Sequence, residues 1–112
     1  MKAVGRTKGI VLVSSLAVLF VIVGSIIENE YQITTDEHNQ RLPAIYGDIV
    51  VWHDNRNGNW DIYGYNLSEP EEFQITEDPA NQLYPAIYGY IVVWVDKRFG
   101  RWDLFWHDLV DN

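Results

Sequence analysis

Two stretches of the chain are nearly the same, and this repetition limits the possible folds more than any other feature. Residues 31–70 align with residues 73–112 at a constant offset of 42 residues, and about half of the aligned positions are identical. The segment PAIYGDIVVW at residues 43–52, for example, returns as PAIYGYIVVW at residues 85–94. A fixed period of this length is typical of proteins built from stacked, similar units. The chain is therefore expected to contain two copies of one structural unit.

Each unit is predicted to consist of four short β-strands, and the predicted fold class is all-β. An aromatic content of 14% favours strands, in which flat side chains fit a pleated surface. The second predicted strand is apolar on both faces, whereas a strand with one solvated face would alternate. Four strands in 40–45 residues, covered on both faces, are typical of a β-propeller blade. In the first copy the predicted strands are residues 43–47, 48–54, 59–67 and 72–78, with hairpin-forming residues NRNG at 55–58.

The hairpin between the two middle strands carries the pattern D-x-R-x-G-x-x-D-I-Y. Together with the QIT and PAIYG segments, this pattern resembles the TolB-like β-propeller repeat and is most similar to the repeats of archaeal cell-surface proteins. The resemblance covers about residues 31–112. It implies a cell-surface or periplasmic location and a role in interactions, and it implies no enzyme activity. The matching residues are Asp54, Arg56, Gly58, Asp61, Ile62 and Tyr63 in the first copy, and Asp96, Arg98, Gly100 and Asp103, followed by Leu104 and Phe105, in the second.

Two propeller-type blades make an incomplete propeller, because closed propellers typically have 4–8 blades. Blade one is expected at about residues 43–78. Blade two is expected at about residues 85–109, with residues 31–36 as its fourth strand. Three alternatives follow. Several chains could assemble into a homo-oligomeric ring, the chain could be a truncated remnant of a larger propeller protein, or the two blades could form a short open stack.

The first 28 residues are predicted to be a signal peptide or an N-terminal transmembrane anchor. Residues 9–27 carry no charge and follow Lys2, Arg6 and Lys8. A run of about 20 apolar residues can span a bilayer as a helix, and cleaved signals usually have a shorter apolar core. The basic flank is expected to stay on the cytoplasmic side. The chain is thus expected in the cell membrane with residues 29–112 outside, or secreted to the cell surface if the segment is cleaved.

The charge of the remaining chain excludes nucleic acid as an expected partner. From Glu28 onward there are 16 acidic and five basic residues. Binding to phosphates requires clustered Lys and Arg. The chain has no cysteine, so neither a disulfide nor a thiolate metal site is possible.

Three tryptophans are candidates for ligand contact, since aromatic faces can stack on sugar rings. They are Trp60, Trp102 and Trp106. Trp106 stands where the first copy has Gly64, and departures from the repeat are better site candidates than repeated positions. Packing in the fold is the alternative role for all three.

The repeated polar residues are interpreted as structural braces. A catalytic pair would seldom be duplicated with its surroundings, and this applies to Asp54 with Arg56, to Asp96 with Arg98, and to Asp61 and Asp103. The loop DNRNGNWD has no carboxylate in the register of a calcium loop. The histidines His38, His53 and His107 share no metal-like spacing, so no metal, cofactor or catalytic residue is predicted. Asn66, in the triplet NLS, matches the pattern of a glycosylation acceptor.

These observations predict a non-catalytic cell-surface β-propeller repeat protein that mediates protein or glycan contacts. The alternatives are a structural component of the cell envelope that self-assembles through its open blade faces, and a truncated remnant.

Overall fold

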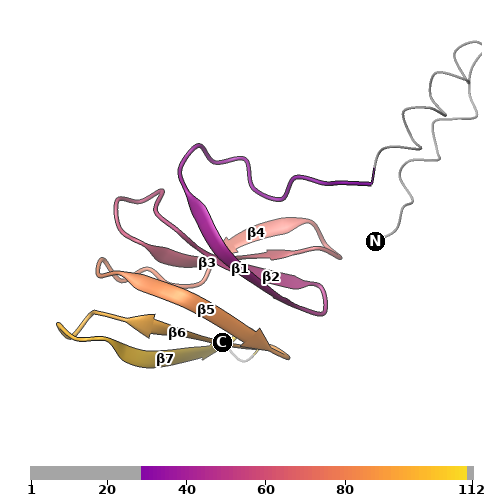
Figure 1. The fold of residues 1–112 in the computed structure, drawn as a ribbon. Coiled ribbons are helices and arrows are strands. Elements are labelled where there is room, and N and C mark those ends of the chain that lie inside the picture. The colour runs from indigo at the N-terminus through magenta and orange to yellow at the C-terminus, as the bar shows by residue number, and fades with distance from the viewer. Residues whose placement is uncertain (1–28, 111–112) are drawn as a thin grey trace, which may run out of the picture. The chain divides into compact units, whose positions relative to one another are not determined.

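The computed structural model describes residues 29–110. By its internal contacts the chain divides into residues 1–33 and residues 34–112, and every strand of the described part belongs to the second unit (Figure 1). The strands are β1 (Gln40–Tyr46), β2 (Ile49–Asp54), β3 (Asp61–Asn66), β4 (Glu71–Gln74), β5 (Gln82–Tyr88), β6 (Ile91–Asp96) and β7 (Asp103–Asp108).

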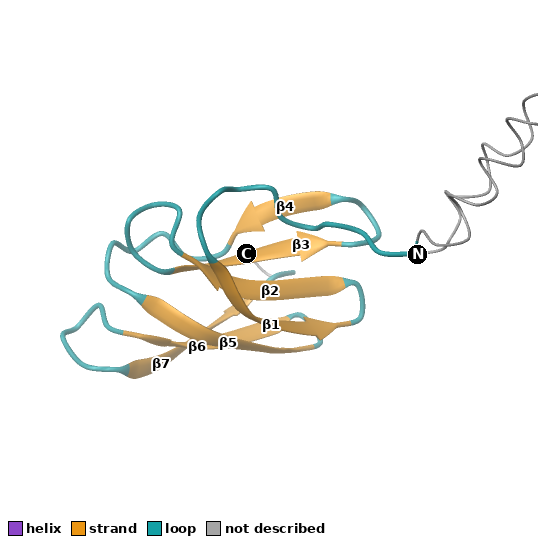
Figure 2. Cartoon of the chain, turned by 45° about the horizontal axis from the view of Figure 1, so that its top comes forward, coloured by secondary structure: helices purple, strands orange, loops and turns teal. Residues whose placement is uncertain are grey.

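The strands form two antiparallel sheets, which confirms the predicted all-β class (Figure 2). The first sheet has the order β1-β2-β3-β4, and the second has the order β5-β6-β7. Strands that follow one another in the chain are also neighbours in each sheet. The pairing register repeats as well, because Trp52 lies opposite Tyr63 in the first sheet and Trp94 lies opposite Phe105 in the second. The two copies of the sequence therefore fold alike.

The first strand of each sheet starts earlier than predicted and contains a bulge. β1 begins at Gln40, three residues before Pro43. Leu42 has a φ of 51° and its counterpart Tyr84 has a φ of 56°, an uncommon conformation for residues other than glycine. A proline follows each of them, and proline fits a bulge because it has no N–H to donate to the ladder.

Residues 31–36 do not form the strand that was expected to complete the second sheet. The second sheet has three strands, and residues 29–39 show no strand conformation. From Thr34 onward, local hydrogen bonds hold the segment instead. The hydroxyl of Thr34 donates to Oε1 of Gln40 at 3.1 Å, and the N–H of His38 donates to Oδ1 of Asp36 at 2.8 Å. Side-chain bonds of this kind compete with strand pairing.

The predicted hydrophobic helix, with its role as signal peptide or anchor, falls on residues 1–28 and lies outside the described residues. Between residues 29 and 110 there is no helix of the length and apolar character that crossing a membrane requires.

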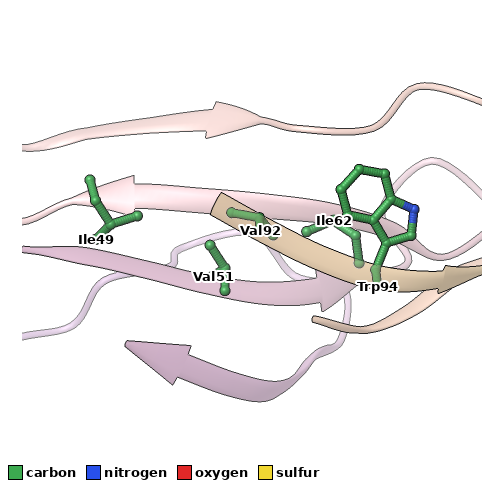
Figure 3. Close-up of a cluster of buried hydrophobic side chains, with 5 residues drawn as sticks. All are labelled: Ile49, Val51, Ile62, Val92 and Trp94. Atoms are coloured by element: carbon green, nitrogen blue, oxygen red, sulfur yellow. The ribbon is translucent and has the colours of Figure 1, made fainter. Parts of the chain in front are cut away.

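The hydrophobic core lies between the two sheets. Ile49 and Val51 on β2 and Ile62 on β3 point toward Val92 and Trp94 on β6 (Figure 3). All five side chains are at most 9% exposed. Full burial of such a side chain stabilises a fold by about 1.5–3 kcal/mol. The contact between the two repeat units is thus a main source of stability.

Gly64 explains how β4 covers the edge of the first sheet. A Cβ atom at this position would lie 2.6 Å from Cζ of Phe73 on β4, so no larger residue fits without displacing that ring. The second sheet has Trp106 at the equivalent place on β7. A bulky residue is tolerated there because no strand of the described part pairs with the outer edge of β7.

Candidate interaction site

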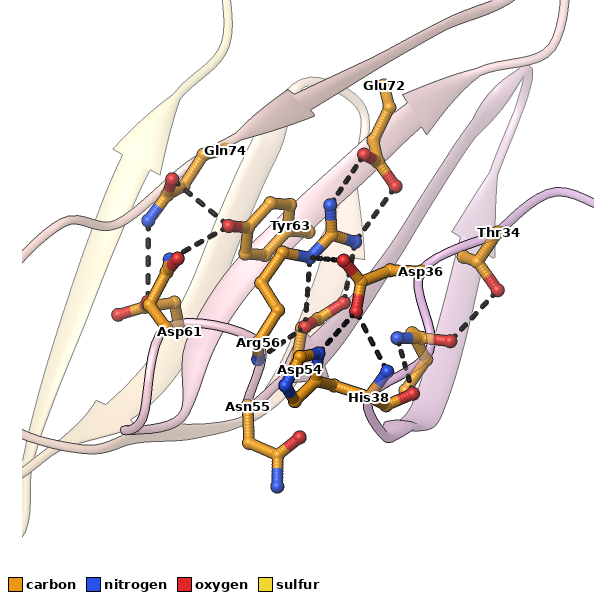
Figure 4. A network of polar contacts seen from close by, with 12 residues as sticks. Thr34, Asp36, His38, Asp54, Asn55, Arg56, Asp61, Tyr63, Glu72 and Gln74 are labelled. Carbon is orange, nitrogen blue, oxygen red and sulfur yellow. Dashed lines mark hydrogen bonds and ion pairs between the residues drawn. The ribbon is translucent and has the colours of Figure 1, made fainter.

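The hairpin loop between β2 and β3 is organised around Asp54, whose side chain is fully buried. Arg56 binds this carboxylate with two bonds, from Nε to Oδ1 at 3.1 Å and from Nη2 to Oδ2 at 2.8 Å (Figure 4). The indole N–H of Trp52 donates to Oδ2 at 3.0 Å. Burial raises the pKa of Asp54, but the hydrogen bonds from Arg56 and Trp52 outweigh it and hold the pKa below its ordinary value of 3.8. The charge is therefore fixed within the loop.

Arg56 extends this brace to two other segments of the chain. Its Nη1 and Nη2 atoms bind the carboxylate of Glu72 on β4 at 2.9 Å and 3.0 Å, and its Nε lies 3.8 Å from Asp36 (Figure 4). The guanidinium also lies over the ring of Tyr63, 4.1 Å from its centroid. Hydrogen bonds to Asp54 and Glu72 raise the pKa of Arg56. One cation thus links the loop to both the outer strand and the segment before β1.

The second sheet repeats this brace. Arg98 binds the buried Asp96 at 3.0 Å and 2.7 Å, and Trp94 donates to the same carboxylate at 3.0 Å. Arg98 lies 3.9 Å from Asp78 and over the ring of Phe105, at 4.2 Å. The same arrangement therefore holds both hairpin loops in the same geometry. Gly58 and Gly100 close the two loops with φ values of 95° and 86°, which other residues rarely adopt.

Asp61 and Asp103 hold the same position in the repeat but have different surroundings. Asp61 is buried, and its carboxylate accepts from Asn57 at 3.0 Å and from Asn59 at 2.8 Å. Burial raises the pKa of Asp61. Asp103 instead pairs at 3.0 Å with the exposed Arg101. The loop side chains around Asp61 donate to it, and the part of the chain that the structure describes contains no cluster of three or more His, Asp or Glu residues able to hold a metal ion.

Trp60 lies in a hollow between the first strands of the two sheets, where the sequence placed no other site residue. The hollow has a volume of about 510 Å³ and is lined by Arg41, Leu42, His53, Trp60, Leu83 and Tyr84. The ring of His53 meets those of Trp60 and Tyr84 edge to face, with centroid distances of 4.8 Å and 5.7 Å. The guanidinium of Arg41 lies 5.7 Å from the Trp60 ring. Trp60 is thus half-buried and engaged in packing on one side.

His53 joins the two sheets through a bond that requires a neutral ring. Its Nδ1 atom accepts the backbone N–H of Tyr84 at 3.0 Å, so Nδ1 carries no proton in this arrangement. Burial, assisted by Arg41, lowers the pKa of His53 below 6.5. The second copy has Val95 at this position, and that difference between the copies is the signal in the sequence that could have identified His53.

We expect acid to weaken the fold through His53. Below pH 6.5 the unfolded chain takes up a proton at this residue while the folded chain does not, so the free energy of unfolding falls by at most about 1.4 kcal/mol per pH unit. In His53→Gln, the amide oxygen can accept the same N–H but does not titrate. Denaturant unfolding is measured at several pH values over about two units, from pH 7.5 to 5.5. The free energy of unfolding should fall less steeply with decreasing pH in the variant than in the wild type. Equal slopes would contradict this role.

The face of the second sheet that points away from the first sheet is open. Leu104 is 78% exposed, whereas its counterpart Ile62 is completely buried. Val93 is 39% exposed, whereas its counterpart Val51 is also completely buried. Trp106 is exposed on the same strand as Leu104. Trp106 could be predicted from the sequence as a site residue, whereas Leu104 could not, because an apolar residue in a strand is typical of a core position.

The remaining candidate residues do not form a common site with the open face of the second sheet. Trp102 is exposed, and the ammonium of Lys97 lies 5.2 Å from its ring. Asn66 ends β3, and its Oδ1 accepts the N–H and hydroxyl of Ser68, each at 2.9 Å. His38 binds Asp36 near the start of the first sheet. Glycosylation of Asn66 and sugar binding by Trp60, Trp102 or Trp106 stay predictions.

Comparison with models of known protein families gave no match, and comparison with curated proteins gave none either. The resemblance to TolB-like repeats therefore stays a prediction from the residues that carry it.

Proposed function

We propose that this chain is a non-catalytic, externally displayed β-propeller repeat protein that binds a protein partner through the second sheet. The binding surface would be the open face of this sheet together with the outer edge of β7. One observation carries the proposal. Positions that are buried between the sheets in the first copy, such as Ile62, are exposed at the equivalent place in the second copy, as at Leu104. A face of this composition gains free energy when it is covered.

A protein partner fits this surface better than a glycan. Leu104 and Val93 are aliphatic and offer no stacking platform, while the edge of a sheet presents backbone N–H and C=O groups that an incoming strand can pair with. Trp106 would serve as an aromatic anchor within this contact. The uncharged residues 9–27 would hold the chain in a membrane and place the binding surface outside.

A structural role by self-assembly is the second candidate function. It is favoured by the equivalence of the two sheets, because the open face of the second sheet corresponds to the face that the first sheet uses against its own neighbour. Both candidates use the same surface and differ in the partner that covers it.

Site-specific photo-crosslinking tests the proposal in cells that naturally make the chain. A photoreactive residue replaces Trp106 in one variant, and Glu69, which is exposed in the turn between β3 and β4, in the control variant. We expect a protein adduct from position 106 and none from position 69. Absence of any protein adduct at position 106 would overturn the proposal. Binding on a glycan array that is lost in Trp106→Ala would replace the protein partner by a glycan.

A further inference from the structure

The connection between the two sheets, residues 75–82, shows how one repeat unit is joined to the next. The N–H groups of Ile75 and Thr76 donate to the carbonyl of Ile62 on β3, at 2.8 Å and 3.2 Å. The hydroxyl of Thr76 accepts the N–H of Ile62 at 2.9 Å. The N–H of Ile62 and its carbonyl thus point to the outer edge of β3, where β4 also lies (Figure 1).

The end of the same connection binds the residue before β3. The N–H of Gln82 donates to the carbonyl of Trp60 at 2.7 Å, and Oδ1 of Asn81 accepts the N–H of Trp60 at 2.9 Å. Thr76 also donates to Oε1 of Gln82 at 2.8 Å, which closes the connection on itself. The side chains of Thr76 and Asn81 and the backbone N–H of Gln82 therefore bind Ile62 and Trp60 of the preceding sheet and its hairpin. The side chain of Gln82 holds the connection in place by bonds to Thr76 and Ala80.

The segment before the first sheet contains the same residues. Ile33, Thr34, Asn39 and Gln40 correspond to Ile75, Thr76, Asn81 and Gln82. Two contacts repeat as well. Thr34 donates to Gln40 at 3.1 Å, and Asp36 lies 3.8 Å from Arg56, as Asp78 lies 3.9 Å from Arg98. Residues 34–40 are thus arranged as a connection that leads into a sheet, although the described part of this chain has no earlier sheet for them to bind.

The second sheet lacks, in the described part, a strand or connection at its outer edge. Leu104 and Trp102 stand where Ile62 and Trp60 stand in the first sheet, and β7 pairs with β6 through the same register that joins β3 to β2. By this equivalence, the N–H and carbonyl of Leu104 point to the outer edge of β7. Within residues 29–110, no fourth strand pairs with that edge.

We propose that the outer edge of β7 binds residues 31–40 of a second copy of this chain. The contact is head-to-tail, so each copy offers its N-terminal segment to one neighbour and its β7 edge to another. This inference rests on the proposed function, because it names the partner of the same surface. Two to four copies, with two sheets each, would supply the roughly 4–8 sheets of a closed propeller.

The junction between the two sheets of one chain indicates the contacts of the junction between copies. Ile33 and Thr34 donate through their N–H groups to the carbonyl of Leu104 in the neighbour, and the Thr34 hydroxyl accepts the N–H of Leu104. Asn39 and Gln40 bind the backbone of Trp102 in the neighbour. The side chains of Tyr31 and Ile33 then lie against the open face of the neighbour's second sheet beside Leu104, as Phe73 and Ile75 pack against the core cluster that contains Ile62.

The junction between copies differs from the junction within the chain at several positions. Arg101 stands where Asn59 donates to the carbonyls of Asp78 and Ala80. Tyr31 corresponds to Phe73, but its cross-strand neighbour is Trp106 instead of Gly64. Because the Phe73 ring leaves no room for a Cβ atom at position 64, the Tyr31 ring must turn away from Trp106 in this junction. Val95 replaces His53, so the junction between copies lacks the histidine bond that joins the sheets within the chain.

Association of the full chain in detergent micelles tests this contact, with mass measured by light scattering coupled to size exclusion. The variant Ile33→Pro removes an N–H that the junction needs. The control, Glu37→Pro, places a proline where the second copy already has Pro79. We expect the wild-type chain and Glu37→Pro to form an oligomer of defined size. Ile33→Pro should dissociate at a concentration at least about ten-fold higher, which corresponds to the loss of about 1.4 kcal/mol.

A complementation experiment makes the direction of the contact testable. Ile33→Pro keeps an intact β7 edge, and Leu104→Asp keeps an intact N-terminal segment but places a charge on the covered face. Neither variant should form closed oligomers alone, whereas an equimolar mixture should form a one-to-one pair. A wild-type monomer, or an Ile33→Pro variant that associates like wild type, would overturn the inference.

The crosslinking experiment separates this inference from the proposed function. An adduct from position 106 to a second copy supports both. An adduct to a different protein supports the proposed function and contradicts the partner named here, and absence of a protein adduct contradicts both.

Discussion

Replacing Ile62 by alanine is expected to lower the free energy of unfolding by about 2–4 kcal/mol. Ile62 is completely buried and contacts the core that the two sheets share (Figure 3). Truncation to alanine loses the free energy of transferring the removed carbons from water into the core. It also leaves a cavity, because the two hydrogen-bonded sheets cannot move together to fill it. The loss would be a large part of the stability of a domain of this size.

Leu104→Ala is the matched control for Ile62→Ala. Leu104 occupies the same position in the repeat but is 78% exposed, so its truncation should cost within about 0.5 kcal/mol in the monomeric chain. Both variants are measured by denaturant unfolding, at a concentration at which the chain is monomeric. Equal effects at the two positions would mean that the core does not lie between the sheets as described.

The architecture of each sheet could be predicted from the sequence because it depends on local signals. The apolar run of the second strand, the hairpin residues NRNG and the offset of 42 residues were sufficient to place β2, β3, β6 and β7 within a few residues. The start of β1 and β5 was missed by three residues. It depends on the positive φ of Leu42 and Tyr84, and no residue type signals that conformation at these positions.

The exposed and buried members of each repeated pair could not be distinguished in the same way. Ile62 and Leu104 are both apolar residues at the second position of a strand, and their sequence surroundings are similar. They differ because another sheet lies against the face of the first sheet that carries Ile62, and none in the described part lies against the equivalent face of the second sheet. The order in which the sheets stack decides this difference. Residues 31–36 show the same limit, because strand character in a segment does not by itself specify the edge with which the segment pairs.

The braces could be predicted from the sequence, but their additional partners could not. The recurrence of Asp54 with Arg56 in both copies indicated a structural brace, yet only the fold brings Glu72 and Asp36 to the same guanidinium (Figure 4). The contact between Arg56 and Glu72, which are 16 positions apart, depends on how β4 lies against β3. No pattern within one repeat encodes them.

The variant Asp54→Asn is expected to cost about 3 kcal/mol in the free energy of unfolding. An amide can accept fewer of the hydrogen bonds that Arg56 and Trp52 donate to the buried carboxylate. The substitution also removes the negative charge that the guanidinium of Arg56 contacts. Asp103→Asn is the control, since its partner Arg101 is 74% exposed, and surface pairs of this kind contribute about 0–1 kcal/mol. Denaturant unfolding at pH 7 compares the two variants.

The pH dependence gives the Asp54 prediction a second, independent readout. The folded chain holds the pKa of Asp54 below its ordinary value of 3.8, so the stabilisation is fully present above pH 3.8 and is lost as the pH falls through the lower, folded value. The difference in unfolding free energy between wild type and Asp54→Asn should therefore be constant from neutral pH down to about pH 4 and shrink below it. A difference that persists unchanged at about pH 2 would mean that the variant acts by steric disturbance and not through the charge of the carboxylate, because below pH 3.8 the unfolded wild-type chain takes up a proton at Asp54 and the variant cannot.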